Sequence, residues 1–309
     1  MSSELRVIGA EELRARLPMA AAIDALEESF RTLDPTGGPL RTHVETPHGS
    51  LLLMPAFGRA GVGVKLVSLT PANPERGLPF LHASYVLFDA ETQAPEAVLD
   101  GSALTALRTA AVSGLATRFL SRQDGGRLVV FGAGVQARSH LEAMRSVRPV
   151  IDLAVVSRSR GAAEALVEEG LGRGLRARVG EPEAVREADL VCTCTTAEEP
   201  LFDGSWLPAG VHVNAVGSYR PETRELDTEA VRRARVVVET REVALAEAGE
   251  LLIPIREGVI DAGHVVADLA ETVRGAEVRR SPDDVTLFKS VGMAFEDLVV
   301  ARAVVDAGR

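Results

Sequence analysis

The feature that most constrains this chain is a glycine-rich turn between an apolar strand and a helix. The run RLVVF is followed by GAGVQA, which places Gly132, Gly134 and Ala137 in a GxGxxA pattern. The first glycine permits a tight turn, the second lets the backbone approach a pyrophosphate, and the third small residue lets helix and strand pack closely. A helix is expected from Arg138 to Val147, and the free backbone N–H groups at its N-terminus bind phosphates, so Val135 and Gln136 are also expected to contact the cofactor. The pattern predicts a dinucleotide-binding site.

Strands and helices alternate after this turn. Apolar strands are expected at IDLAVVS, LRARVG, ADLVCTCTT, VHVNAVG and RVVVET, with helices between several of them. This alternation is typical of a doubly wound parallel sheet, the Rossmann fold, so we expect an α/β protein. A long helix is expected to close the chain, from Leu287 to about Ala307.

The first 120 residues show a different pattern. A helix is expected from Glu11 to about Leu33, and another from about Ala103 to Leu120. Between them, short strand-like runs follow one another closely at 41–46, 50–54, 62–69 and 83–89. Strands in close succession predict an antiparallel or mixed sheet rather than β-α-β units. This part is therefore expected to form a second, α+β domain.

The residues after the second strand of the alternating region indicate which dinucleotide binds. An acidic residue at that place holds the ribose 2′-OH of NAD, whereas basic residues accommodate the 2′-phosphate of NADP. The chain has Ser157, Arg158, Ser159 and Arg160 there, and Asp152 lies at the opposite end of the strand. The sequence therefore predicts NADP(H) as the preferred cofactor, with NAD(H) as the alternative.

The composition argues against several classes of protein. With 44 acidic and 34 basic side chains the formal charge is −10, which disfavours binding to nucleic acid. No apolar run approaches the ~20 residues of a membrane span, and the N-terminus lacks the apolar stretch of a secretory signal. We therefore expect a cytoplasmic protein. Cys192 and Cys194 lie in one apolar strand without a histidine cluster, which favours packing over a metal site.

Three basic residues of the second domain are candidates for binding an acidic substrate. Lys65, one of only two lysines, lies inside the apolar run GVGVKLVSL, where a charge is costly without a partner. Arg108 lies in the small-residue run ALTALRTAAVSGLA, and Arg41 opens the first strand-like run. Arginines grip carboxylates through paired hydrogen bonds, and a buried lysine can donate a proton. A structural ion pair is the alternative for each of the three.

At these residues the chain resembles the ornithine cyclodeaminase/mu-crystallin family. The matching stretches are LLLMPA at 51–56, GVKLVSLTPANPERGLP at 63–79, DGSALTALRTAAVSGLATRFL at 100–120, FGAGVQAR at 131–138, VNAVGSYRPETRELD at 213–227 and LFKSVGMAFEDLVVARAV at 287–304. The resemblance implies a homodimer. It also implies that residues 1–120 and 290–309 form a substrate-binding and dimerisation domain, into which a Rossmann domain, residues 121–289, is inserted.

The resemblance also assigns roles to single residues. It implies that Arg41, Lys65 and Arg108 contact the substrate. Ser218 and Ser290 are expected near the nicotinamide. Lys289 is expected either there or in an ion pair with Glu296 or Asp297.

Two departures from the family pattern bear on the substrate. Cyclodeaminases carry a glutamate at the position of Leu52 and an aspartate at the position of Tyr219. In the family, those carboxylates serve the second amine of a diamino acid, so a pocket without them is ill suited to ornithine or lysine. Both departures are similar to the mu-crystallin/ketimine reductase branch of the family.

These observations lead us to expect an NADPH-dependent reductase of a small cyclic imino carboxylate, such as pyrroline-2-carboxylate or piperideine-2-carboxylate. Arg41 and Arg108 would hold the carboxylate, and Lys65 would hydrogen-bond or protonate the imine nitrogen. Three alternatives stay open. They are an amino-acid cyclodeaminase, an alanine dehydrogenase, and a non-catalytic protein that binds a ligand together with NADPH.

Overall fold

The computed structural model describes residues 5–32, 38–39 and 41–308, and the end expected for the first helix, Leu33, lies outside these ranges. The chain divides into two compact units. The split unit consists of residues 1–108 and 293–309, and the continuous unit consists of residues 109–292. Helix α3 (Gly101–Leu120) contributes residues to both units.

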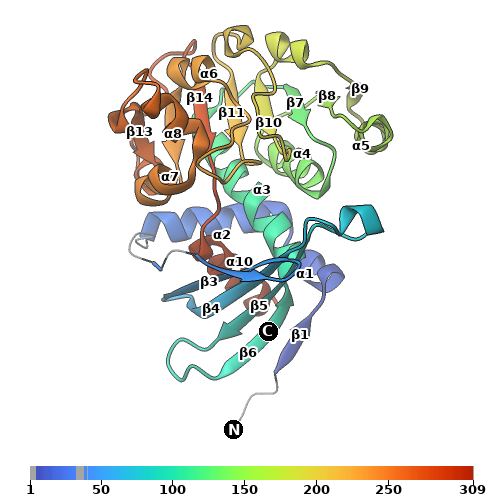
Figure 1. Cartoon of the computed structure of the whole chain (residues 1–309), viewed down its shortest axis with the longest axis vertical. Coiled ribbons are helices and arrows are strands. Elements are labelled where there is room, and N and C mark those ends of the chain that lie inside the picture. The colour runs from blue at the N-terminus through green and yellow to red at the C-terminus, as the bar shows by residue number, and fades with distance from the viewer. Residues whose placement is uncertain (1–4, 33–37, 40, 309) are drawn as a thin grey trace. The chain divides into compact units, whose positions relative to one another are not determined.

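The split unit is built on a six-stranded mixed sheet with the strand order β1-β6-β5-β4-β3-β2 (Figure 1). Its elements are β1 (Arg6–Ile8), α1 (Ala10–Arg16), α2 (Met19–Thr32), β2 (Thr42–Thr46), β3 (Gly49–Gly58), β4 (Gly61–Leu69), the 3-10 helix η1 (Pro74–Arg76), β5 (Leu81–Phe88), β6 (Pro95–Asp100) and α10 (Ala294–Asp306). Strands β2 to β6 pair antiparallel, and β1 pairs parallel with β6. The mixed sheet expected from the closely spaced strands is therefore present.

One face of this sheet is the core of the split unit. Along β4 the residues at odd positions from Gly61 to Leu69 are buried, whereas the even positions are more exposed. Helix α10 packs on β3, β4 and β5, and it also packs on α2. Lys65 lies on the buried face of β4, so its ammonium group is enclosed between the sheet and α10.

Two helix expectations were wrong in their bounds. The first helix is two helices, because the chain is extended at Leu17, just before Pro18. The long final helix is instead strand β14 (Thr286–Lys289) followed by the shorter α10. All four residues of β14 are buried, since the strand lies in the middle of a parallel sheet. A strand buried on both faces has no alternation of buried and exposed positions that would separate it from a helix.

The continuous unit contains an eight-stranded parallel sheet with the order β13-β12-β14-β11-β10-β7-β8-β9 (Figure 1). Its elements are β7 (Arg127–Phe131), α4 (Val135–Val147), β8 (Asp152–Val156), α5 (Arg160–Gly172), β9 (Arg176–Val179), η2 (Pro182–Glu187), β10 (Leu190–Thr193), η3 (Gly204–Trp206), β11 (His212–Ala215), α6 (Thr228–Arg233), β12 (Arg235–Val238), α7 (Arg241–Glu247), α8 (Gly249–Arg256), η4 (Ala262–His264), β13 (Val265–Asp268), α9 (Leu269–Val273) and β14. The expected doubly wound Rossmann sheet is confirmed. The elements α7, α8, β13 and α9 were not expected from the sequence.

The second half of α3 packs inside the continuous unit. The hydroxyl of Ser113 lies 3.0 Å from Nε2 of His140, and the Asn214 amide donates to Oγ1 of Thr117 at 2.9 Å. The division of the chain therefore falls at residues 108 and 292, whereas the sequence placed domain boundaries at residues 120 and 289.

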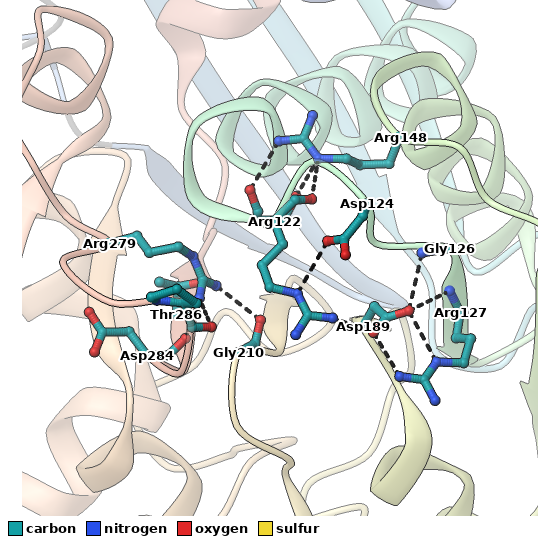
Figure 2. Close-up of polar contacts among 12 residues, drawn as sticks. Arg122, Asp124, Gly126, Arg127, Arg148, Asp189, Gly210, Arg279, Asp284 and Thr286 are labelled. Carbon is teal, nitrogen blue, oxygen red and sulfur yellow. Dashed lines mark hydrogen bonds and ion pairs between the residues drawn. The ribbon is translucent and has the colours of Figure 1, made fainter.

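Polar side chains tie the amino ends of the parallel strands together, as Figure 2 shows. Asp189 accepts hydrogen bonds from the backbone N–H groups of Gly126 and Arg127 and from the Arg122 and Arg127 guanidinium groups. The buried Arg148 donates to the carbonyl oxygens of Thr117, Arg118 and Ser121. Those carbonyls lie at the C-terminal end of α3, where helix carbonyls lack N–H partners further along the helix, so one guanidinium group binds several of them. These side chains have structural roles at this end of the sheet.

Candidate functional site

The glycine turn has the geometry that a dinucleotide requires. Strand β7 ends at Phe131, and Gly132 follows with a φ of 99°, in the left-handed region. A Cβ atom at Gly132 would lie 2.6 Å from the carbonyl oxygen of Cys194, so only glycine fits. Gly134 caps α4 in an extended conformation, and a Cβ atom there would meet nothing within 4 Å. Ala137 is fully buried, as close packing of helix and strand demands.

The start of α4 is open to a phosphate group. Val135 is 64% exposed, and within the described chain no side chain caps the helix N-terminus at Gly134. A helix of 13 residues presents unpaired N–H groups and a partial positive charge at this end. These residues fit the pyrophosphate of a dinucleotide.

In the turn after β8, Arg158 differs from its neighbours because they are engaged in contacts within the chain. Ser159 caps α5 by accepting from the backbone N–H of Ala162, and Ser157 accepts from the N–H of Ser159. Arg160 pairs with Glu164 at 2.9 Å. Arg158 is exposed and has no ion-pair partner among the residues that the structure describes. Its guanidinium group therefore stands at the carboxyl end of β8 without a competing carboxylate.

Buried carboxylates organise the loops at the carboxyl ends of the central strands. Glu225 accepts from the backbone N–H groups of Thr195 and Gly217 and from the hydroxyl of Thr193, which joins the loops after β10 and β11. Burial raises the pKa of Glu225. Glu239 accepts from the Ser290 hydroxyl at 2.6 Å and holds the loop after β14.

Ser218 and Ser290 lie on these organised loops. The Ser218 hydroxyl donates to the carbonyl oxygen of Thr223 at 2.8 Å, so it is engaged within the chain, as the Ser290 hydroxyl is. Lys289 donates to the carbonyl oxygen of Ser218 at 2.6 Å and pairs with Glu250 at 3.0 Å. Lys289 therefore has the structural ion pair that was one of its two expected roles, but its partner is Glu250 and not Glu296 or Asp297. Lys289 ends β14, and its bond to the Ser218 carbonyl holds the loop that follows β11.

The split unit brings two of the predicted substrate residues onto one carboxylate. The Lys65 ammonium donates to Oδ1 of Asp297 at 2.9 Å, and Nε of Arg108 donates to the same oxygen at 3.0 Å. Arg108 also pairs through Nη1 with Glu296 at 2.8 Å. All four side chains are buried. Asp297 and Glu296 lie in the first turn of α10.

Local structure fixes where Arg108 lies. Asp100 ends β6 and accepts from the N–H of Ala103, which caps α3. At Gly101 a Cβ atom would lie 2.7 Å from the backbone of Ala83 and Ser84, so glycine lets the helix start close against β5. Two turns later the helix presents Arg108 to the carboxylates of α10.

The charge of Arg41 also acts on Lys65. The pKa of Lys65 is lowered from 10.5 to about 8, because burial and the positive charge of Arg108 outweigh the opposing effect of Asp297, and Arg41 adds the smallest of these contributions. A lysine with a pKa near 8 can donate a proton at neutral pH and recover it from solvent.

The two positions that depart from the cyclodeaminase pattern carry no carboxylate and are packed. Leu52 is 3% exposed and lies in an apolar cluster with Met54, Val67 and Leu69. Tyr219 is half-buried against the main apolar cluster of the continuous unit.

Sequence reasoning missed the roles of Glu296 and Asp297. Both acids lie in the run AFEDLVV, and both are fully buried. Adjacent acids in an apolar helix were the available signal, because a buried carboxylate requires a cationic partner. The partner could not be read from the sequence, since Lys65 lies 232 positions away.

A family model decides the classification. The model of the ornithine cyclodeaminase/mu-crystallin family matches residues 4–309. The chain belongs to this family. A member from Bacillus cereus, a Δ1-pyrroline-2-carboxylate reductase, is 38% identical, and the alignment covers 96% of this chain and 94% of that protein. The rat ketimine reductase mu-crystallin is 37% identical, with 96% and 94% covered.

Solved structures of the family are close to this one. The Δ1-pyrroline-2-carboxylate reductase of Thermococcus litoralis, in complex with NADH and L-proline, has a TM-score of 0.93 at 37% identity and covers 98% of this chain and 97% of its own. An archaeal alanine dehydrogenase dimer with bound NAD has a TM-score of 0.92 at 33% identity, covering 98% and 96%. In the described part of this chain, no helix is long and apolar enough to cross a membrane.

Proposed function

We propose that this protein is an NADPH-dependent reductase of a small cyclic imino carboxylate, with Δ1-pyrroline-2-carboxylate as the first candidate. The enzyme class is an oxidoreductase that uses a nicotinamide cofactor and acts on a carbon–nitrogen bond. The observation that carries the proposal is the buried group of Lys65, Arg108 and Asp297, joined by one carboxylate oxygen. The named activities of the relatives support it.

The cations of this group favour a substrate that carries a carboxylate. Lys65 and Arg108 are buried side by side on Asp297, and the charge of Arg41 also acts on Lys65. Guanidinium groups suit a carboxylate because they donate two parallel hydrogen bonds.

Each residue then has a defined task in the reaction. Arg41 and Arg108 bind the substrate carboxylate and fix the plane of the imine. A bound reduced nicotinamide supplies the hydride that the imine carbon accepts. As the imine carbon accepts the hydride, the C=N π electrons move to the nitrogen and form the new N–H bond with a proton from the Lys65 ammonium. Lys65 then regains a proton from solvent. Holding the reacting atoms within about 3–3.5 Å contributes much of the rate.

The cofactor preference follows from the turn after β8. Arg158 is exposed and unpaired within the described chain, and Ser157 and Ser159 flank it. Such a group suits a 2′-phosphate, and the turn has no acid to hold a ribose 2′-OH. The turn at Gly132 and Gly134 would hold the pyrophosphate, with the N–H groups of α4.

An amino-acid cyclodeaminase is the less favoured enzyme. The positions of Leu52 and Tyr219 are apolar or aromatic and packed, so neither supplies a carboxylate for a second amine. Alanine dehydrogenase is favoured as the second candidate by the likeness to the archaeal enzyme. Its substrate also has a single carboxylate.

The proposal includes a cytoplasmic homodimer. The sheet face of the split unit that does not face α10 carries half-buried apolar side chains, among them Val64, Leu66 and Val86. Phe57, at the end of β3, is 66% exposed. A second copy of this face would cover such a surface, and the archaeal alanine dehydrogenase is a dimer.

A cofactor-oxidation screen tests the proposal. NADPH and NADH are each offered with Δ1-pyrroline-2-carboxylate, piperideine-2-carboxylate, and pyruvate with ammonia or methylamine. We expect the fastest turnover with NADPH and a cyclic imine. Ammonia release from ornithine or lysine would instead show a cyclodeaminase, and fast reduction of pyruvate with ammonia would show an alanine dehydrogenase. Tight NADPH binding without any turnover would show a ligand-binding protein.

A further inference from the structure

One carboxylate oxygen bridges the two cations to which the proposed reaction gives different tasks. Oδ1 of Asp297 accepts from Nζ of Lys65 at 2.9 Å and from Nε of Arg108 at 3.0 Å. The second oxygen, Oδ2, lies 2.7 Å from Nζ of Lys65. The distance between a proton donor and a carboxylate-binding group is thus set by a third residue.

We propose that Asp297 is a positioning residue, which holds Lys65 in its protonated form and at a fixed distance from Arg108. This inference rests on the proposed function for the tasks of Lys65 and Arg108. Asp297 itself would not touch the substrate. It acts through the two side chains that it binds.

The surroundings of Lys65 single out Asp297 as its counter-ion. The charged or titratable groups that face Lys65 are Asp297 from α10, Arg108 from α3, and Arg41. Tyr85 lies opposite it on β5. Two of these neighbours are cations and one is a phenol, whereas Asp297 is an anion that hydrogen-bonds Lys65 and raises its pKa. Without it, burial and two positive charges would favour the neutral amine.

Glu296 provides a matched control. It is the preceding residue of the same helix, it is equally buried, and it pairs with Arg108. A change at Glu296 therefore also removes a buried carboxylate of α10 that binds Arg108. It leaves the bond between Asp297 and Lys65 in place.

The chain has only two lysines, which makes a direct measurement feasible. Protein labelled with ¹³C at the lysine ε-carbon gives two lysine signals, from Lys65 and Lys289, and Lys65→Met assigns them. The Lys65 signal is titrated with pH in wild type, Asp297→Asn and Glu296→Gln. We expect Asp297→Asn to lower the pH at the midpoint of the Lys65 titration by about 1 pH unit or more. Glu296→Gln should leave this midpoint within about 0.3 pH unit of wild type. The Lys289 signal, bonded to Glu250, should not change.

The kinetic pH profile supplies the second readout. With NADPH and Δ1-pyrroline-2-carboxylate, kcat should fall as pH rises through the Lys65 midpoint, and in Asp297→Asn this fall should move to lower pH. An unchanged Lys65 midpoint in Asp297→Asn would overturn the inference. The titration needs no substrate, so it also separates the two proposals. A shifted Lys65 midpoint in a protein that never reduces cyclic imines would confirm that Asp297 stabilises protonated Lys65 and would reject the proposed function.

A second variant covers the case in which Asp297→Asn does not fold. Asp297→Glu keeps the negative charge on a side chain that is one methylene group longer. The midpoint of the Lys65 titration should therefore stay within about 0.5 pH unit of wild type. The displaced carboxylate should still lower kcat/KM by about 10-fold or more, because it shifts Lys65 relative to Arg108. Unchanged kcat/KM in that variant would contradict the positioning role.

Discussion

Lys65 and Tyr85 lie directly opposite each other on the antiparallel strands β4 and β5, and both side chains are buried. The Tyr85 hydroxyl has no hydrogen-bond partner in the described part of the chain. Burial raises the pKa of Tyr85 well above its usual value, and the charge of Asp297 raises it further. The phenol is therefore neutral, and it offers Lys65 no charge.

Tyr85→Phe is expected to leave the free energy of unfolding within about 1 kcal/mol of wild type, or to increase it. The reason is that removal of an unpaired buried polar atom costs no hydrogen bond. Urea denaturation measures the difference. A loss above about 2 kcal/mol would mean that the hydroxyl is hydrogen-bonded in solution.

Arg108→Lys is expected to raise the KM for the cyclic imine by about 10-fold or more. Lysine keeps a positive charge beside Glu296 and Asp297, but it lacks the two parallel donors that bind a carboxylate. Steady-state kinetics with saturating NADPH checks this. Arg108→Ala is the poorer test, because it removes the cation that pairs with buried Glu296 and one of the two cations that bind Asp297, which costs about 3–5 kcal/mol of stability. An unchanged KM in a folded Arg108→Lys enzyme would place the substrate carboxylate elsewhere.

Arg158→Ala is expected to weaken NADPH binding about 10- to 100-fold while NADH binding changes little. A charge-assisted bond to the 2′-phosphate would be lost, and NADH has no such phosphate. Fluorescence titration gives both dissociation constants. Arg160→Ala is the matched control, because Arg160 lies two residues on and already pairs with Glu164. Equal effects of the two variants would remove the assignment of the phosphate site.

Protonation of buried histidine should weaken the fold below neutral pH. His140 is fully buried, and burial lowers its pKa from 6.5 to about 4. The unfolded chain therefore binds the proton first, so stability is complete above pH 6.5 and declines as the pH falls toward 4. Between pH 7.5 and 5.5 this histidine alone should cost ~1 kcal/mol of unfolding free energy. In His140→Gln the pH dependence should be shallower by that amount, and an identical slope would contradict the assignment.

The dinucleotide turn was predictable because its information is local. The residues from Arg127 to Ala137 specify a strand, a tight turn and a helix, and the structure has all three in place. The same holds for Lys65, since a lysine in an apolar strand requires a partner wherever the strand goes.

The partners were not predictable, because they come from distant segments. Lys65 and Asp297 meet only after β4 has packed against the last helix, and Lys289 pairs with Glu250 on α8, which the sequence did not indicate. The final helix was overextended for a related reason. Only the central place of β14 in the sheet explains why both of its faces are buried.

The most direct test of the account compares wild type and Lys65→Met. Each is mixed with NADPH and Δ1-pyrroline-2-carboxylate, and proline formation is followed by mass spectrometry beside the dissociation constant for NADPH. We predict that wild type forms one proline for each NADPH oxidised. We predict that Lys65→Met loses kcat by about 100-fold or more, as removal of a general acid does, and binds NADPH within about twofold of wild type. Equal loss of turnover and NADPH affinity, or a Lys65→Met enzyme that still forms proline at the wild-type rate, would contradict it.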